Sequence, residues 1–161
     1  MIGAGIIGTG YIGNVHLETL NRMSGVEVRS VFDVNRDLAI DAAKKHRVPK
    51  VAGDIEELIT DNDIEVVHVC SPNRYHFEQS IQVLKAGKNL FSEKPLAMTS
   101  EEGKQLVSIA DEKNAITGIG FCYRYYPVVQ EMAHRLREGY YGTVRMVTGS
   151  WLQDWLSQID D

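Results

Sequence analysis

Three closely spaced glycines, Gly8, Gly10 and Gly13, constrain the fold of this 161-residue chain more than any other feature. An apolar run over residues 2–7, with the length of a buried parallel strand, precedes them, and a helical pattern follows. In such a turn the first glycine allows a tight bend, the second lets the backbone approach a ligand, and the third lets the helix pack against the strand. The spacing therefore predicts the first strand-to-helix turn of a Rossmann domain that binds a dinucleotide.

A second match to the same glycine spacing begins at Gly3, but too few residues precede it to form a strand. We therefore expect the pyrophosphate to lie against the helix that follows Gly8 and Gly10, where free N–H groups and the helix dipole favour negative charge. Alone, the motif is a weak signal, because glycines also serve ordinary turns. The cofactor-binding residues predicted in this turn are Gly8, Gly10, Tyr11, Ile12 and Gly13.

An acidic residue in the expected place strengthens the signal. Asp33 ends the second predicted strand, 20 residues after Gly13. A carboxylate there can accept hydrogen bonds from the ribose hydroxyls of the adenosine, and it repels a 2′-phosphate. Asp33 therefore predicts NAD rather than NADP as the cofactor, although the nearby Arg36 complicates that choice. The alternative is a solvated residue at the start of a helix.

The rest of the chain alternates between strand-like and helix-like segments with short connections. Predicted strands cover residues 2–7, 26–32, 64–70, 89–92 and 115–122, with a short one near Val51. Predicted helices cover residues 14–24, 36–46, 75–86 and 127–138, and two more begin after the caps Asp54 and Thr99. The alternation predicts an α/β fold with a Rossmann-type doubly wound parallel sheet over residues 1–122. Residues 123–161 are expected to hold a connecting helix and, over residues 144–151, the first strand of a further unit.

Composition excludes several other classes of function. A net charge of −5 gives no reason to expect nucleic acid as a partner, and no apolar run is long enough to span a membrane. The five histidines are scattered without metal-ligand spacing, so we expect no metal. Cys70 and Cys122 are expected to be buried, reduced thiols, and the chain is expected to be cytoplasmic.

Several strings distributed along the chain resemble the Gfo/Idh/MocA oxidoreductase family. They are GIIGTGYIGNVHLETL at the first turn, VHVCSPNRYH at the end of the fourth strand, SEKPLAMT at the end of the fifth, GIGFCYRYYP at the end of the sixth and YGTVRMVTGSWLQDWL near the end of the chain. The Glu-Lys-Pro string at a strand end is much more specific than the glycine motif. The resemblance implies a Rossmann domain followed by a second α/β domain with an open antiparallel sheet.

By this resemblance Lys94 is the catalytic residue and lies next to both the nicotinamide and the substrate hydroxyl. Hydride leaves a carbinol carbon only as its hydroxyl proton is removed, and an ammonium group can hydrogen-bond to that hydroxyl or relay the proton. Glu93 is similar to a family residue near the nicotinamide ribose, and Pro95 is expected to follow a cis peptide bond. An exposed loop lysine is the alternative reading of Lys94.

The resemblance also assigns cofactor-binding roles to Ser71, Pro72, Asn73, His76 and Arg124. Ser71 and Asn73 would line the ribose and pyrophosphate. His76 would either support the wall of the site or lie on the surface at a helix start. Arg124 would make polar contacts at the boundary between cofactor and substrate, or else a structural ion pair.

The family's second domain supplies most of the substrate pocket, the usual oligomer interface and a catalytic Asp/His pair. This chain is therefore expected to be the NAD-binding portion of an enzyme that transfers hydride between a sugar- or polyol-type secondary alcohol and a nicotinamide cofactor. Alone it is expected to be weakly active or inactive, and its parent enzyme is expected to be a homo-oligomer. The alternatives are a non-catalytic module that senses dinucleotides and a truncated remnant of such an enzyme.

Overall fold

Parallel strands dominate the part of the chain that the computed structural model describes, residues 1–152. Within that range six strands form one sheet in the order β3-β2-β1-β4-β5-β6, and every neighbouring pair is parallel. This order confirms the predicted Rossmann-type α/β fold. The strands are β1 (Ile2–Ile7), β2 (Val26–Phe32), β3 (Lys50–Val51), β4 (Val66–Val69), β5 (Asn89–Ser92) and β6 (Thr117–Ile119).

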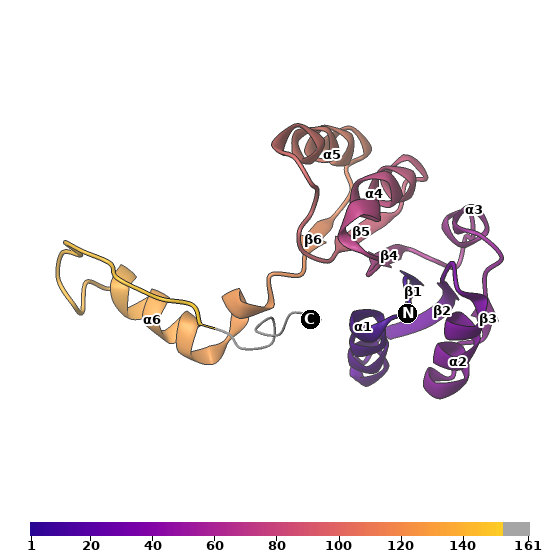
Figure 1. Cartoon of the computed structure of the whole chain (residues 1–161), viewed down its shortest axis with the longest axis horizontal. Helices are drawn as coiled ribbons and strands as arrows, with labels where there is room; N and C mark the ends of the chain where they lie inside the picture. Colours follow the sequence, from indigo (N-terminus) through magenta and orange to yellow (C-terminus); the bar gives the residue numbers. More distant parts are fainter. Residues whose placement is uncertain (153–161) are drawn as a thin grey trace, which may run out of the picture. The chain divides into compact units, whose positions relative to one another are not determined.

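Helices cover the two faces of this sheet in two groups (Figure 1). Helices α1 (Tyr11–Arg22) and α2 (Arg36–His46) pack together on one face. On the other face α4 (His76–Lys85) packs against both α3 (Ile55–Ile59) and α5 (Ser100–Lys113). Each group buries its own apolar cluster against the strands, so the sheet is doubly wound as predicted. No helix among residues 1–152 is both long and apolar enough to cross a membrane.

Local sequence signals account for the ends of most helices. Asn35 caps α2 by accepting hydrogen bonds from two backbone N–H groups, and α2 has the predicted bounds. Thr99 and Glu102 form the predicted capping box of α5. At α3 the cap Asp54 is also as predicted, but the Glu57 carboxylate accepts from the N–H of Gly53 instead of that of Asp54.

A second unit begins at Cys122, directly after the unit formed by Met1–Phe121. It contains the 3₁₀ helix η2 (Cys122–Tyr125) and α6 (Pro127–Arg137). The predicted strand over residues 115–122 is wrong in length, because only Thr117–Ile119 pairs with β5. Cys122 is exposed, which corrects the expectation of a buried thiol, whereas Cys70 is buried.

The strand predicted over residues 144–151 does not form. A strand requires hydrogen-bonding partners for its backbone, and no other segment within residues 1–152 pairs with this one. Alternation of apolar residues alone is therefore not enough to make this segment a strand among the described residues. Residues 153–155, part of the last string that resembles the family, also lie outside the described residues.

Candidate functional site

The glycine turn has the geometry that its spacing predicts. Gly8 has φ +92°, and a Cβ there would lie 2.7 Å from backbone atoms of Cys70 and Ser71. A Cβ on Gly13 would overlap the carbonyl oxygen of Gly8, so α1 packs directly against the turn. Gly10, by contrast, has nothing within 4 Å of a Cβ position. The first and third glycines are therefore needed by the fold, and the second leaves open space.

Helix α1 starts at Tyr11, three residues before the predicted start, so the turn leads directly into the helix. Its N-cap is Gly10, no side chain caps it, and its first turn carries no acidic residue. An uncapped start leaves backbone N–H groups and the positive end of the helix dipole available to an anion. This helix start has the arrangement that binds a pyrophosphate in other dinucleotide-binding proteins. It is formed by Gly10, Tyr11, Ile12 and Gly13.

Two side chains hold the carbonyl and amide groups of this turn. Asn14 donates from its amide to the carbonyl oxygens of Thr9 (2.7 Å) and Gly10 (3.0 Å). Asp33, at the end of β2, accepts from the Thr9 backbone N–H at 2.7 Å and from the Thr9 hydroxyl at 3.1 Å. The turn is thus tied both to its own helix and to the neighbouring strand.

The other oxygen of Asp33 accepts the backbone N–H of Asn35 at 2.9 Å. Asp33 is half-buried, and it is Asn35 that caps the following helix. Asp33 therefore lies just before a helix start, as the alternative reading has it, but it also anchors the glycine turn through Thr9. Because a carboxylate can accept about four hydrogen bonds, one remains for a ligand after these three.

The loop after β4 lies beside the glycine turn, since β4 pairs with β1. The Ser71 hydroxyl donates to the Gln79 side chain at 2.5 Å. His76 is buried, with Nδ1 2.7 Å from the Pro95 carbonyl oxygen and Nε2 2.7 Å from that of Ser71. This excludes the surface position for His76 and shows that it connects two loops in the wall of the site. Its contact with a cofactor stays a prediction. Pro72 and Asn73 are exposed at the same edge of the sheet.

The Glu93-Lys94-Pro95 turn follows β5, the next strand in the sheet. Glu93 is buried, Lys94 is exposed, and the peptide bond between Lys94 and Pro95 is cis, as expected. The Lys94 backbone N–H donates to the Glu93 carboxylate at 3.2 Å, and His16 on α1 approaches the same carboxylate at 3.1 Å. The Lys94 ammonium forms no ion pair with any other residue of the described range.

Burial shifts the protonation of two groups next to this turn. It lowers the pKa of His68 to about 4, with a smaller contribution from the adjacent His16, so the ring is neutral at pH 7. Burial also raises the pKa of the Cys70 thiol, and the Glu93 charge adds to that effect. Cys70 is therefore an inert, protonated thiol.

A hollow of about 170 Å³ lies between the ends of β1, β2 and β4 and includes predicted and unpredicted residues. The predicted ones are Gly8, Asp33, Ser71 and Pro72. Sequence reasoning did not single out Val34, Arg74, Tyr75 and Gln79, which also line it. Arg74 and Tyr75 lie within one of the strings that resemble the family, and the Arg74 guanidinium stacks 4.8 Å from the Tyr75 ring centre. Their place in that string is the sequence signal that could have identified Arg74 and Tyr75 as lining residues.

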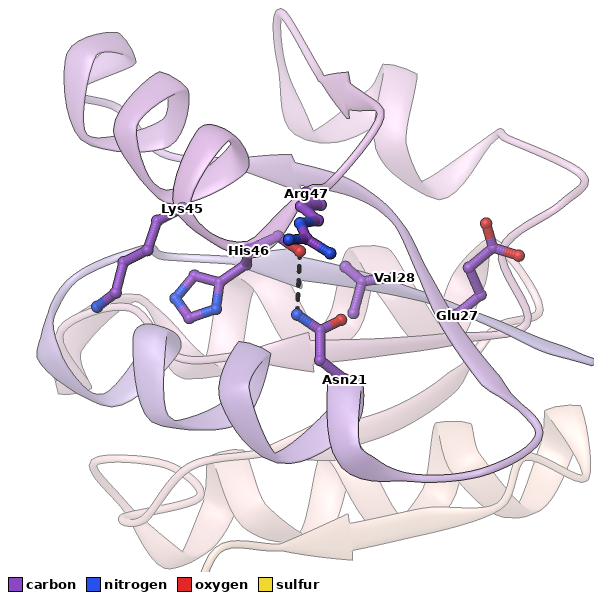
Figure 2. A pocket seen from close by; sticks show the side chains of 6 residues that line it. All are labelled: Asn21, Glu27, Val28, Lys45, His46 and Arg47. Atoms are coloured by element: carbon purple, nitrogen blue, oxygen red, sulfur yellow. Dashed lines mark hydrogen bonds between the residues drawn. The ribbon is translucent and has the colours of Figure 1, made fainter.

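A larger hollow of about 450 Å³ lies elsewhere, and Figure 2 shows the residues that line it. They come from the end of α1, the start of β2 and the end of α2, and they are Asn21, Glu27, Val28, Lys45, His46 and Arg47. This is the opposite end of the strands from the glycine turn. Ligands of open α/β sheets bind at the carboxyl ends of the strands, so we do not assign the site to this hollow.

Arg124 belongs to the second unit, in η2, where its carbonyl accepts a hydrogen bond from the Gln130 side chain. It makes no ion pair with another residue of the described range. Its contact with a cofactor stays a prediction. Among residues 1–152 no group of three or more metal-ligating side chains comes together.

Residues 2–121 match the Gfo/Idh/MocA oxidoreductase family, NAD-binding Rossmann fold. The chain belongs to this family. It is 33% identical over 96% of its length to the levoglucosan dehydrogenase of Pseudarthrobacter phenanthrenivorans, and 37% identical over 91% of its length to the inositol 2-dehydrogenase of Salmonella typhimurium. It spans 42% and 44% of these two relatives, less than half of each.

Solved structures give the same assignment of fold. The Lactobacillus casei myo-inositol dehydrogenase in complex with NAD(H) and myo-inositol superposes with a TM-score of 0.82 at 31% identity. The match covers 86% of this chain and 42% of that one. GenD2 from gentamicin A biosynthesis, in complex with NAD, gives a TM-score of 0.79 at 30% identity, with 84% of this chain and 38% of that one covered.

Proposed function

We propose that this chain binds NAD⁺ and is the cofactor-binding part of a dehydrogenase that oxidises a secondary alcohol of a sugar or polyol. The observation that carries the proposal is the uncapped start of α1 beside a glycine turn held by Asp33. The names of the related dehydrogenases support the class of reaction and of substrate.

The residues present fit a dinucleotide. Open space at Gly10 admits a diphosphate against the backbone, and the start of α1 supplies N–H donors. Asp33 keeps acceptor capacity for the adenosine ribose, and the hollow beside it, near Val34 and Tyr75, is mostly apolar, as an adenine ring requires. Ser71 and Asn73 lie on the next loop, beside the place where the pyrophosphate would bind.

Asp33 also favours NAD⁺ over NADP⁺. Its carboxylate is anchored by three backbone or hydroxyl donors, so it cannot move away from a 2′-phosphate without breaking the glycine turn. Arg36 and Arg74 are exposed cations nearby, but neither pairs with Asp33. Repulsion at a fixed carboxylate is therefore the larger effect.

Lys94 is the residue of this chain that we assign to the chemistry. When bound, the nicotinamide would accept a hydride from the substrate carbon. The Lys94 ammonium is exposed at the carboxyl end of β5 and unpaired among the described residues, so it is available to hydrogen-bond to the substrate hydroxyl as its proton leaves. The buried Glu93 holds the Lys94 backbone but leaves the side chain free.

Isothermal titration calorimetry tests the proposal. We expect one NAD⁺ to bind per chain and NADP⁺ to bind at least tenfold more weakly; absence of NAD⁺ binding by the folded chain contradicts the proposal. We further expect little or no NADH production from myo-inositol by this chain alone. The residues that complete the substrate pocket and the oligomer interface would belong to the part of the relatives that the chain does not span.

A further inference from the structure

Two histidines and a glutamate form a hydrogen-bonded triad on the α1 side of the sheet. His68, on β4, lies with Nδ1 3.0 Å from Nδ1 of His16, on α1. His16 in turn places Nε2 3.1 Å from Oε1 of Glu93, at the end of β5. The three residues are separated by 52 and 77 positions in the sequence, so only the fold brings them together.

Surrounding groups restrict the three side chains of this triad. The His68 ring stacks on Phe91, with centres 5.0 Å apart and planes 20° from parallel. The side chains of His16 and Glu93 are only 12% and 11% exposed. Gly120, on the loop after β6, has no room for a Cβ, because that atom would lie 2.7 Å from the Glu93 carboxyl carbon. A glycine at this position is thus explained by the buried carboxylate beside it.

The chemistry of the three groups decides which atoms carry protons. A carboxylate only accepts, so the Nε2–H of His16 donates to Glu93. His68 is neutral, because burial lowers its pKa to about 4. It therefore either donates from Nδ1 to a neutral His16 or accepts from a cationic one. In both cases His16 presents a donor to Glu93 in a fixed orientation.

Glu93, the last member of the triad, contacts the backbone of the turn that carries Lys94. Oε2 of Glu93 accepts the Lys94 backbone N–H at 3.2 Å, and the Glu93 N–H donates to Val69 at 2.9 Å. At the other end of the turn, His76 contacts the Pro95 carbonyl oxygen at 2.7 Å. The Lys94 backbone is thus held from both sides, while its side chain remains free.

We propose that His68, His16 and Glu93 are positioning residues that hold the Glu93-Lys94-Pro95 turn for the nicotinamide half of the dinucleotide. This inference rests on the function proposed above. The order β2-β1-β4-β5 supports the choice of half: Asp33, directly after β2, serves the adenosine, the turn after β1 serves the pyrophosphate, and the end of β5 remains for the nicotinamide side. A buried carboxylate there also favours a cationic ring such as that of NAD⁺.

Calorimetric titration with two ligands tests the proposal, because ADP-ribose lacks the nicotinamide that NAD⁺ carries. Glu93→Gln and His16→Asn should each lower NAD⁺ affinity about tenfold, the scale of one hydrogen bond to a charged group. ADP-ribose affinity should change less than twofold. The double variant should bind NAD⁺ no more weakly than Glu93→Gln alone, because both changes remove the same contact between His16 and Glu93. His134→Gln, at an exposed position on α6, is the matched control and should alter neither affinity.

An equal loss of affinity for both ligands, or no loss for either, would overturn this inference while leaving the proposed function standing. Failure of the unsubstituted chain to bind either ligand would overturn both. Should the variants not fold, the ¹⁵N resonances of the His16 ring decide the question in the unsubstituted chain. NAD⁺ should shift them and ADP-ribose should not, and an identical response to the two ligands would refute the positioning role.

Discussion

At the scale of single residues, Asp33 has two tasks that the structure separates. One oxygen holds the glycine turn through Thr9, and the other accepts from Asn35. The carboxylate is therefore both a structural anchor and the group we propose for recognition of the ribose. Its substitution should affect both affinity and selectivity.

Asp33→Ala should lower NAD⁺ affinity about tenfold, because the bond to the ribose and the anchor at Thr9 are both lost. NADP⁺ affinity should fall less or rise, because the repulsion of the 2′-phosphate disappears. Calorimetry with both dinucleotides measures the ratio. Asp37→Asn, an exposed carboxylate in the first turn of α2, is the control and should leave the ratio unchanged. A selectivity ratio that Asp33→Ala does not alter would contradict the role of Asp33.

His68 should make the stability of the protein depend on pH. Its pKa falls from 6.5 to about 4 on folding, so the unfolded chain binds more protons between these values. The contribution of His68 to the free energy of unfolding is therefore greatest above pH 6.5. It decreases as the pH falls towards 4, by at most about 3 kcal/mol. Urea denaturation at pH 7 and pH 5 measures the difference. His68→Gln should reduce it and His134→Gln should not; an undiminished pH dependence in His68→Gln would refute this assignment.

Residues joined by short sequence spacing could be predicted, and residues joined by the fold could not. The glycines and Asp33 carry their meaning in their distance along the chain. His16 and His68 give no such signal, because they meet only across paired elements. Thr9 was also missed, since its contact with Asp33 depends on the register of β1 against β2. The sequence left the burial of His76 undecided, since a residue at a helix start can point either way.

At the scale of elements, the glycine turn separates the needs of the fold from those of the ligand. Gly8→Ala should destabilise the protein by about 2 kcal/mol or more, because its Cβ meets two backbone segments and its φ is +92°. Gly25→Ala has a similar φ of +84° but open space, and should cost about 1 kcal/mol. Thermal unfolding compares them. Equal effects would show that the close approach to Cys70 and Ser71 carries no energy.

Gly10→Ala should behave differently, because its φ of −65° suits any residue and its Cβ meets nothing. The variant should unfold at nearly the same temperature as the unsubstituted chain. Its NAD⁺ affinity should nevertheless fall at least tenfold, because the added methyl occupies the space we assign to the diphosphate. Unchanged NAD⁺ affinity would place the diphosphate elsewhere.

The elements themselves were mostly predictable, because alternation of short apolar runs and capped helices has few other solutions. Helix α2 and strands β1, β2 and β5 have their predicted bounds. The prediction failed where an element depends on a partner. Residues 144–151 have the pattern of a strand, but no segment in the described part of the chain pairs with them. The predicted start of α1 is three residues too late, because its N-cap is Gly10, which has no side chain to mark the start of a helix.

At the scale of the whole molecule, the chain consists of a doubly wound unit, Met1–Phe121, and a second unit that starts at Cys122. Every predicted site residue except Arg124 lies in the first unit, at the carboxyl ends of adjacent strands. This arrangement supports dinucleotide binding by the chain itself. The chain thus carries all the residues that we assign to the cofactor, although it spans less than half of each of the two related dehydrogenases.

The most direct test of this account maps NAD⁺ onto the backbone by ¹H–¹⁵N NMR. We predict that NAD⁺ shifts the amide resonances of residues 10–13, 33–35, 71, 73–75 and 93–94, which border the glycine turn and the neighbouring strand ends. The amides of residues 45–47, in the larger hollow of Figure 2, should remain unchanged. Shifts confined to residues 45–47, or none at all from a folded chain, would contradict the account.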